Sequence, residues 1–236
     1  MRTISRQALG TIIFLVGLLT GLALAGAAIW GDFEGMSYFY TGAGYPPFKG
    51  LNCPVLMTRG EAARITAQFD NPSDEEIRPF YQVQVSGLAA TRNFENQVPV
   101  APHSSTTVDW TVDSNDIDLG RFVMVDMQVL RVAGISTREA TCGILVLGIP
   151  GLTGSQVLAG LLAISLTGLV LGLAMRERRA ETIPGKEMTL RNGMRAAGIA
   201  VLLAMLTGLM GSWLIGTVFC AVAVLLLVIL LRVAVT

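Results

Sequence analysis

The chain has 236 residues, of which 52% are hydrophobic and 14% are charged, and its formal net charge is zero. Soluble domains carry about 25% charged residues, so this composition excludes an ordinary soluble globular protein. The charges are unevenly distributed. Residues 31–151 contain eight Lys and Arg against fourteen Asp and Glu, a net charge of −6, and the remaining residues carry +6. No basic stripe of the kind that binds nucleic acid is present.

Three long uncharged runs predict membrane-spanning helices. They are Ala8–Ile29 with 22 residues, Val157–Met175 with 19 and Ala196–Leu231 with 36. About 20 helical residues cross the hydrocarbon core. The third run would be roughly 54 Å long as one helix, so it must turn. Gly211-Ser212-Trp213 is the best position for the turn, because Gly and Ser weaken helices and Trp prefers the membrane interface.

The expected fold is therefore four transmembrane helices with one β-sandwich inserted between the first two. The predicted divisions are a transmembrane anchor at 1–30, an aromatic juxtamembrane segment at 31–50, an extracytoplasmic β-sandwich at 51–149, a second helix at 150–175, a cytoplasmic loop at 176–195 and a helical hairpin at 196–236.

Basic residues near the spans set the expected orientation, because cytoplasmic loops carry an excess of Lys and Arg. Arg2 and Arg6 precede the first span, six Lys and Arg lie in residues 176–195, and Arg232 follows the last span. With four spans all of them lie on one side. This predicts an integral protein of the cytoplasmic membrane with both termini inside and the acidic domain outside.

The first span has an alternative interpretation as a secretory signal. Ala23-Leu24-Ala25 is similar to a small-residue cleavage site. The apolar run is longer than a signal's usual apolar region of about 7–15 residues, which favours an uncleaved anchor.

Alternating side chains predict strands between the first two spans. Apolar and polar residues alternate in Ala63–Phe69, Tyr81–Val85, Thr107–Val112 and Arg121–Val132. A period of two bounded by turn residues is the pattern of half-buried strands. Roughly seven such strands favour a sandwich.

This segment resembles the generic Ig-like sandwich of bacterial extracytoplasmic proteins. The resemblance depends on Asn71-Pro72-Ser73-Asp74 after one strand and on Pro102–Trp110 leading into another. It covers about 95 residues, close to the size of one such domain. It implies an adhesion or scaffold module without an active site.

Cys53 begins this domain and Cys142 lies in its last strand. Outside the membrane a disulfide is the default state of such a pair. A redox or metal pair would need a closer spacing or further ligands, which are missing. Cys220 lies within the last span and is expected to be an unpaired apolar residue.

The sequence contains no pattern typical of an active site or a cofactor site. His103 is the only histidine. Asp113, Asp116 and Asp118 lack the glycine and the terminal glutamate of an EF-hand, which favours a solvated acidic turn and leaves a calcium site as the alternative. The spans carry no ionisable side chains, which disfavours a proton-coupled transporter. We therefore expect neither catalysis nor a cofactor.

Small residues recur at helical spacing within the spans. Gly17 and Gly21, and Gly168 and Gly172, form two G-x-x-x-G motifs that predict close helix packing. Ala200, Ala204 and Gly208 belong to a similar stripe in the third span. The stripe is either packed within the chain or used as a docking face for a partner, and we predicted partner binding there.

Aromatic residues gather in the juxtamembrane segment. Tyr38, Tyr40, Tyr45 and Phe48 lie close together in the sequence. They form either an aromatic belt at the membrane interface or a partner-binding strip, because tyrosine is frequent at interface hot spots. We predicted partner binding for these four residues.

The sequence as a whole predicts a non-catalytic accessory or scaffold subunit of a larger membrane assembly. The alternative is an extracytoplasmic ligand-binding subunit of a transporter or sensor. The expected partners are other membrane protein subunits and the lipid bilayer, with a homo-oligomer as a further option and nucleic acid excluded.

Overall fold

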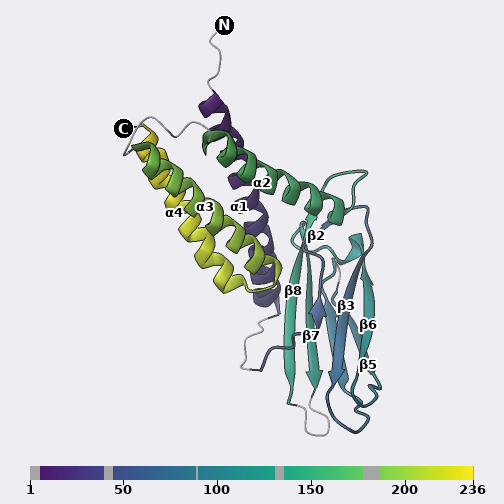
Figure 1. Cartoon of the computed structure of the whole chain (residues 1–236). Helices are drawn as coiled ribbons and strands as arrows, with labels where there is room; N and C mark the ends of the chain where they lie inside the picture. Colours follow the sequence, from purple (N-terminus) through teal and green to yellow (C-terminus); the bar gives the residue numbers. More distant parts are fainter. Residues whose placement is uncertain (1–5, 40–44, 89, 131–135, 178–185, 236) are drawn as a thin grey trace. The chain divides into compact units, whose positions relative to one another are not determined.

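The computed structural model of the chain describes residues 6–39, 45–88, 90–130, 136–177 and 186–235. The chain forms two compact units. Residues 30–157 make up the β unit, and residues 1–29 together with 158–236 make up the helical unit. Figure 1 shows their elements, coloured along the sequence.

Four helices are long and apolar enough to cross a membrane, as the sequence predicts. Their bounds are α1 at Arg6–Tyr38, α2 at Gly154–Glu177, α3 at Lys186–Leu209 and α4 at Trp213–Val235. The predicted turn in the long apolar run is confirmed, because α3 ends at Leu209 and α4 begins at Trp213. Gly211 lies in this turn with a φ of +73°.

Two helix boundaries differ from the expectation. The predicted anchor ends at residue 30, yet α1 continues through Gly31 and Gly35 to Tyr38. A glycine in a helix costs only about 1 kcal/mol, which tertiary packing easily offsets. The third helix begins at Lys186, within the predicted loop. Charged residues such as lysine and glutamate are good helix formers and can extend a helix beyond its apolar part.

Small residues bring α1 and α2 into close contact within the helical unit. A Cβ atom added at Gly17 would lie 2.8 Å from the Cα atom of Gly168, and one added at Gly172 would lie 2.6 Å from the backbone nitrogen of Phe14. One added at Gly21 would lie 2.6 Å from the Ser165 hydroxyl. The four glycines of the two G-x-x-x-G motifs thus lie at helix–helix contacts inside the chain, the geometry that small residues permit in membranes.

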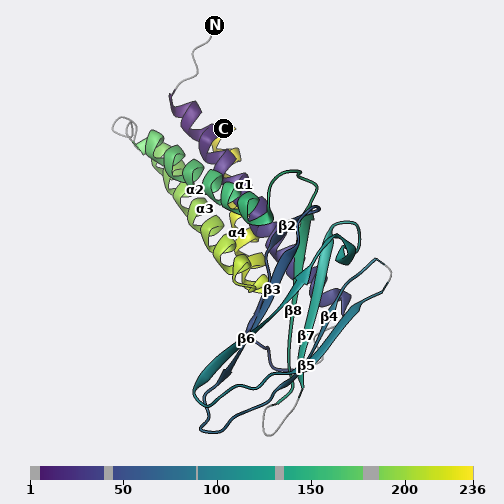
Figure 2. The ribbon, with the colours of Figure 1, turned by 90° about the vertical axis from the view of Figure 1, so that its right-hand side faces the viewer.

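Eight strands form two sheets in the β unit. The strands are β1 at Leu51–Asn52, β2 at Leu56–Thr58, β3 at Ala63–Asn71, β4 at Phe80–Val85, β5 at Arg92–Gln97, β6 at Ser104–Val112, β7 at Phe122–Leu130 and β8 at Arg138–Leu147. One sheet has the order β1-β3-β6 and the other the order β2-β8-β7-β4-β5. Figure 2 shows the two layers, with β3 and β6 in one and β8, β7 and β4 in the other.

A single hydrophobic core lies between the sheets. Ile65 of β3, Val83 of β4, Val125 of β7 and Ile144 of β8 are fully buried in it. The alternation seen in the sequence explains this core, since every second residue of a strand points to the same face. Strand β2 pairs in parallel with β8, whereas the other strand pairs are antiparallel.

Strand β5 was not predicted. Its sequence, RNFENQ, is polar on both faces, and only Phe94 is partly buried. It lies at the edge of its sheet, where both faces of a strand can remain in water. The alternation that identifies a half-buried strand is therefore missing from it.

Candidate functional site

The last turns of α1 pack on the outer face of the five-stranded sheet. A Cβ atom added at Gly31 would lie 2.5 Å from the carbonyl oxygen of Gly143, and one added at Gly35 would lie 2.7 Å from that of Cys142. Only glycine allows a helix backbone to approach a strand backbone this closely. The two glycines beyond the predicted end of the anchor are therefore the residues at which the helix contacts β8.

Aromatic and polar contacts extend this junction. The rings of Trp30 and Phe122 lie 5.6 Å apart, and the hydroxyl of Tyr38 donates a 2.7 Å hydrogen bond to Asp118. Trp30 also donates its indole N–H to Glu34. Both faces of β7 are buried from Phe122 to Met127, although one of them points away from the core. The junction thus buries part of the outer face of this sheet, whose inner face is buried in the core.

A buried carboxyl group lies on this outer face. Asp126 of β7 is 3% exposed and stands between Gln84 of β4 and Thr141 of β8. Gln128 donates hydrogen bonds to Asp126 and to Glu139, 3.3 and 3.2 Å long. The Oδ1 atom of Asp126 has no hydrogen-bond partner among the described residues. Burial, reinforced by the charge of Glu139, raises the pKa of Asp126 to about 7.

This pKa predicts that the β unit becomes less stable as the pH rises. An aspartate in an unfolded chain has a pKa of about 3.9, so the folded state favours the protonated carboxyl. Its stabilisation is complete below about pH 4 and is lost as the pH rises through about 7, a change on the order of 4 kcal/mol. Asp126→Asn should remove this pH dependence from the free energy of unfolding, measured by urea denaturation at pH 4 to 8. The exposed Glu95→Gln should retain it, and an unchanged slope in Asp126→Asn would contradict the assignment.

The predicted disulfide is confirmed. Cys53 and Cys142 are bonded, with their Cα atoms 6.5 Å apart. Cys53 lies where the chain passes from β1 in one sheet to β2 in the other, and Cys142 lies in β8. The bond therefore fixes this crossing to the last strand. Cys220 is a free thiol in α4, as expected.

Sequence reasoning missed the contact that fixes the beginning of α2. The carboxylate of Glu61 accepts hydrogen bonds from the backbone N–H groups of Gly154, at 2.6 Å, and Thr58, at 3.0 Å. The hydroxyl of Thr58 donates to the carbonyl of Leu152 at 2.8 Å. A carboxylate at a helix N-terminus is favourable for the unpaired N–H groups and for the helix dipole. The Thr-x-x-Glu spacing of Thr58-Arg59-Gly60-Glu61 was the sequence pattern that could have indicated this contact.

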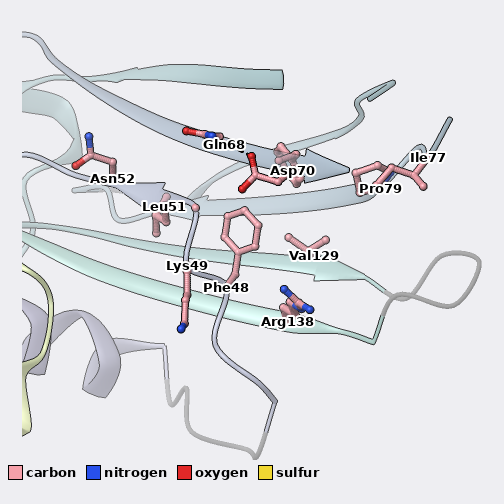
Figure 3. Close-up of a pocket in the computed structure, with 12 residues that line it drawn as sticks. Phe48, Lys49, Leu51, Asn52, Gln68, Asp70, Ile77, Pro79, Val129 and Arg138 are labelled. Atoms are coloured by element: carbon pink, nitrogen blue, oxygen red, sulfur yellow. Dashed lines mark hydrogen bonds between the residues drawn. The ribbon is translucent and has the colours of Figure 1, made fainter. Parts of the chain in front are cut away.

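A recess of about 390 Å³ lies at the end of the β unit where β8 begins. Its lining consists of Phe48, Lys49, Gly50, Leu51, Asn52, Gln68, Phe69, Asp70, Ile77, Pro79, Val129 and Arg138. Figure 3 shows the ring of Phe48 between Asp70 and Arg138. Hydrogen bonds from Ser105 and Gln68 hold the pKa of Asp70 below its usual range. Lys49 and Arg138 form no ion pair with any residue that the structure describes.

The aromatic residues predicted to bind a partner are largely used within the chain. Tyr38 bonds to Asp118, and Phe48 packs on Phe69 with ring centroids 5.3 Å apart. Tyr45 is exposed, and Tyr40 lies outside the described residues. Of the three that the structure describes, Tyr45 offers the most free surface, and Tyr38 and Phe48 are half-buried.

The small-residue stripe of α3 is also used within the chain. Ala200 is 6% exposed and Ala204 is fully buried. A Cβ atom at Gly208 would lie 3.5 Å from Ile29 and 3.6 Å from Ala28 of α1. Packing within the bundle accounts for these three residues, and partner binding at the stripe stays a prediction. The sequence could not distinguish the two, because both use small residues to bring helix backbones together.

The residues considered for metal binding have protein partners instead. Asp113 accepts from the backbone N–H of Asn115, and Asp116 pairs with Arg92 at 2.5 Å. His103 pairs with Asp74 at 2.8 Å in an exposed turn. Within the described ranges, no group of three or more His, Cys, Asp or Glu side chains is arranged to hold a metal ion.

Comparisons with known proteins add little to this description. No family model and no curated protein matches the chain. A cycloisomaltooligosaccharide glucanotransferase from Paenibacillus sp., solved with cycloisomaltoheptaose, is 16% identical over 43% of this chain and 14% of its own, with a TM-score of 0.33. A β-glucosidase from Listeria innocua, solved with glucose, is 14% identical over 41% of this chain and 15% of its own, with a TM-score of 0.30. The match spans about one seventh of each enzyme, and scores this low carry no argument about function.

Proposed function

We propose that the chain is a non-catalytic accessory or scaffold subunit of a larger membrane assembly, which presents an Ig-like domain outside the membrane. The junction of α1 with β8 is the observation that carries this proposal. At 33 residues, α1 is roughly 50 Å long, whereas a bilayer's hydrocarbon core is about 30 Å thick. The residues beyond the bilayer are those packed on the sheet. One helix thus both anchors the domain and forms part of it.

The orientation with both termini inside has two kinds of support. The basic flanks of the four helices follow the positive-inside rule. The disulfide Cys53–Cys142 fits an oxidising compartment, as expected for a β unit on the outer side. The net charge of −6 on residues 31–151 is compatible with translocation, which acidic residues hardly oppose.

Strand order supports the Ig-like assignment. Immunoglobulin-type sandwiches place the first, second and fifth strands in one sheet and the third, sixth and seventh in the other. Here β1, β3 and β6 share one sheet, and β4, β7 and β8 share the other. Two antibody hallmarks are absent. The disulfide joins the β1–β2 crossing to β8 instead of linking the two sheets through β3 and β7, and the core tryptophan, Trp110, lies on β6.

The exposed apolar faces of α2 and α4 are surfaces on which partner helices could pack. Ile164 and Val170 on α2 and Val218 and Leu225 on α4 are 50–64% exposed. In a bilayer such apolar faces contact lipid or the helices of other subunits. The α3 stripe is less suited to a partner, because Ala200 and Ala204 are buried within the bundle.

Extraction in native-lipid polymer discs followed by native mass spectrometry tests the proposal. We expect a stoichiometric second polypeptide beside this chain. Val170→Ala and Leu225→Ala, which reduce exposed apolar area, should weaken its retention without changing the fold. A chain recovered only as a monomer, or only as copies of itself, would contradict the accessory role. In intact cells an impermeant thiol reagent should label Ser104→Cys and not Thr182→Cys.

Capture of an extracytoplasmic ligand is the second candidate, and the recess at Phe48 favours it. Apolar residues such as Phe48 and Leu51 line the recess together with the cations Lys49 and Arg138 and the carboxylate of Asp70, a lining that suits a small amphipathic solute. The same native spectra distinguish the candidates, because a monomer carrying a bound solute that is lost in Arg138→Ala would support capture.

A further inference from the structure

Exposed apolar side chains are unevenly distributed over the β unit. Among its described residues, the large exposed apolar side chains are Trp30, Phe33, Tyr45, Leu88, Leu119, Ile149 and Leu152. All except Tyr45 lie in α1 or in the loops at the end where β4, β6 and β8 finish and β7 begins. Leu88 and Leu119 are 78% and 60% exposed. At the opposite end the turns carry Asp74, Arg78 and His103.

Hydrogen bonds join the loops of this apolar end into one surface. Arg59 donates from its backbone to the carbonyl of Leu147 and from its side chain to that of Gly120, both at 3.1 Å. The backbone N–H of Leu88 donates to the carbonyl of Asn115 at 3.2 Å. The loops are therefore held in place relative to one another within the unit. We call this surface, with Leu88 and Leu119 at its tips, the apolar end.

Leu119 lies at the tip of a tight turn before β7. Its φ is +49°, in the left-handed region, and Gly120 follows with a φ of +72°. The backbone N–H of Arg121 donates a 3.2 Å hydrogen bond to the carbonyl of Asp118 and closes the turn. Asparagine, aspartate and glycine adopt this region at least cost, and they also suit a turn in water. Here the turn instead presents a leucine whose side chain is 60% exposed, and contact with an apolar medium would bury that side chain.

The charges of the apolar end complement a phospholipid headgroup. Arg59 and Arg121 are exposed. The Arg59 guanidinium donates to the carbonyl of Gly120, and that of Arg121 lies 5.6 Å from the centre of the Trp30 ring. The neighbouring carboxylates already accept backbone N–H groups, Glu61 from Gly154 and Asp118 from Leu119. Both guanidinium groups are therefore available to phosphate, which arginine binds in a bidentate manner.

We propose that the apolar end is a membrane-contact surface, with Leu88 and Leu119 inserted into the interfacial region of a phospholipid bilayer and Arg59 and Arg121 at the headgroup phosphates. This surface rests on the proposed membrane anchorage. The position of this surface along the chain, next to the membrane helices α1 and α2, favours lipid as its contact. Trp30 directly follows the apolar run of α1, and Leu152 lies two residues before the start of α2. Tryptophan prefers this interface as well.

Spin-label accessibility in liposomes tests the surface. The full chain with Cys220→Ser is reconstituted in phosphatidylcholine and phosphatidylglycerol, with single nitroxides at Leu88→Cys, Leu119→Cys, His103→Cys or Val222→Cys. We expect the labels at 88, 119 and 222 to collide more with oxygen than with a water-soluble nickel chelate, and the label at 103 to show the reverse. Leu119→Asn should keep the unfolding midpoint in detergent, because asparagine suits that φ, yet shift the label at 88 toward nickel accessibility.

The outcomes distinguish a failure of the proposed surface from a failure of the membrane anchorage on which it depends. A lipid-exposed label at 222 with a water-exposed label at 119 would overturn the surface alone. A water-exposed label at 222 would overturn the anchorage and the surface together. A label at 119 that neither reagent reaches would mean that protein covers the tip, and the lipid assignment would be wrong.

Discussion

The double variant Cys53→Ser/Cys142→Ser is expected to lose about 4–5 kcal/mol of the unfolding free energy of the β unit. The bond joins residues 89 apart in the sequence, and cross-linking so long a segment removes much of the conformational entropy of the unfolded chain. Single domains are stable by about 5–15 kcal/mol, so this loss is about a quarter of the total or more. It should appear as a lower urea midpoint in the tryptophan fluorescence of the chain.

Cys220→Ser provides the matched control for that experiment. It removes a thiol of α4 that takes part in no disulfide, and its urea midpoint should equal that of the unmodified chain. Reductant should lower the midpoint of the unmodified chain and of this control, and leave the double variant unchanged. A double variant as stable as the control would show that the bond contributes little to the fold.

The second large effect is expected at the junction of α1 with β8. A Cβ atom at Gly143 would lie 1.9 Å from the carbonyl oxygen of Gly31, so Gly143→Ala forces two backbones apart. Overpacking of this kind costs about 1–3 kcal/mol or more, and here neither side is a flexible side chain. We expect a loss at the upper end of that range and faster amide exchange in residues 30–38.

Gly148→Ala is the control for this substitution, because nothing lies within 4 Å of a Cβ atom added there. Its effect should stay within about 0.5 kcal/mol, as for most surface substitutions. If Gly143→Ala shows the same midpoint and exchange rates as Gly148→Ala, then α1 does not pack on the sheet in solution.

Sequence patterns predicted the parts of this fold in which one physical requirement dominates. Uncharged length predicted four helices, and alternation predicted strands such as Ala63–Phe69 within β3. The disulfide followed from two cysteines in a segment expected outside the membrane. In each case a single property leaves few alternative structures. The property is apolar length for the helices, periodicity for the strands and redox compartment for the disulfide.

The residues that sequence reasoning could not place are those whose role depends on what lies opposite them. Gly35 weakens an isolated helix, yet it permits the contact with Cys142. Ala204 fits a docking face and a bundle interior equally well in the sequence, and its burial in the chain favours the interior. The recess at Phe48 combines residues from five segments of the chain, so no local sequence pattern could predict it.

The parallel pairing of β2 with β8 has a consequence for biosynthesis. Strand β2 has no other neighbour in its sheet, and its partner Leu145 follows Leu56 by 89 residues. Synthesis proceeds at about 5–20 residues per second, so β8 is made roughly 5 to 20 s after β2. The β unit therefore cannot close before β8 has been synthesised. It folds only after the whole segment has been synthesised, and a chain truncated after Leu130 should be a target for quality-control proteases.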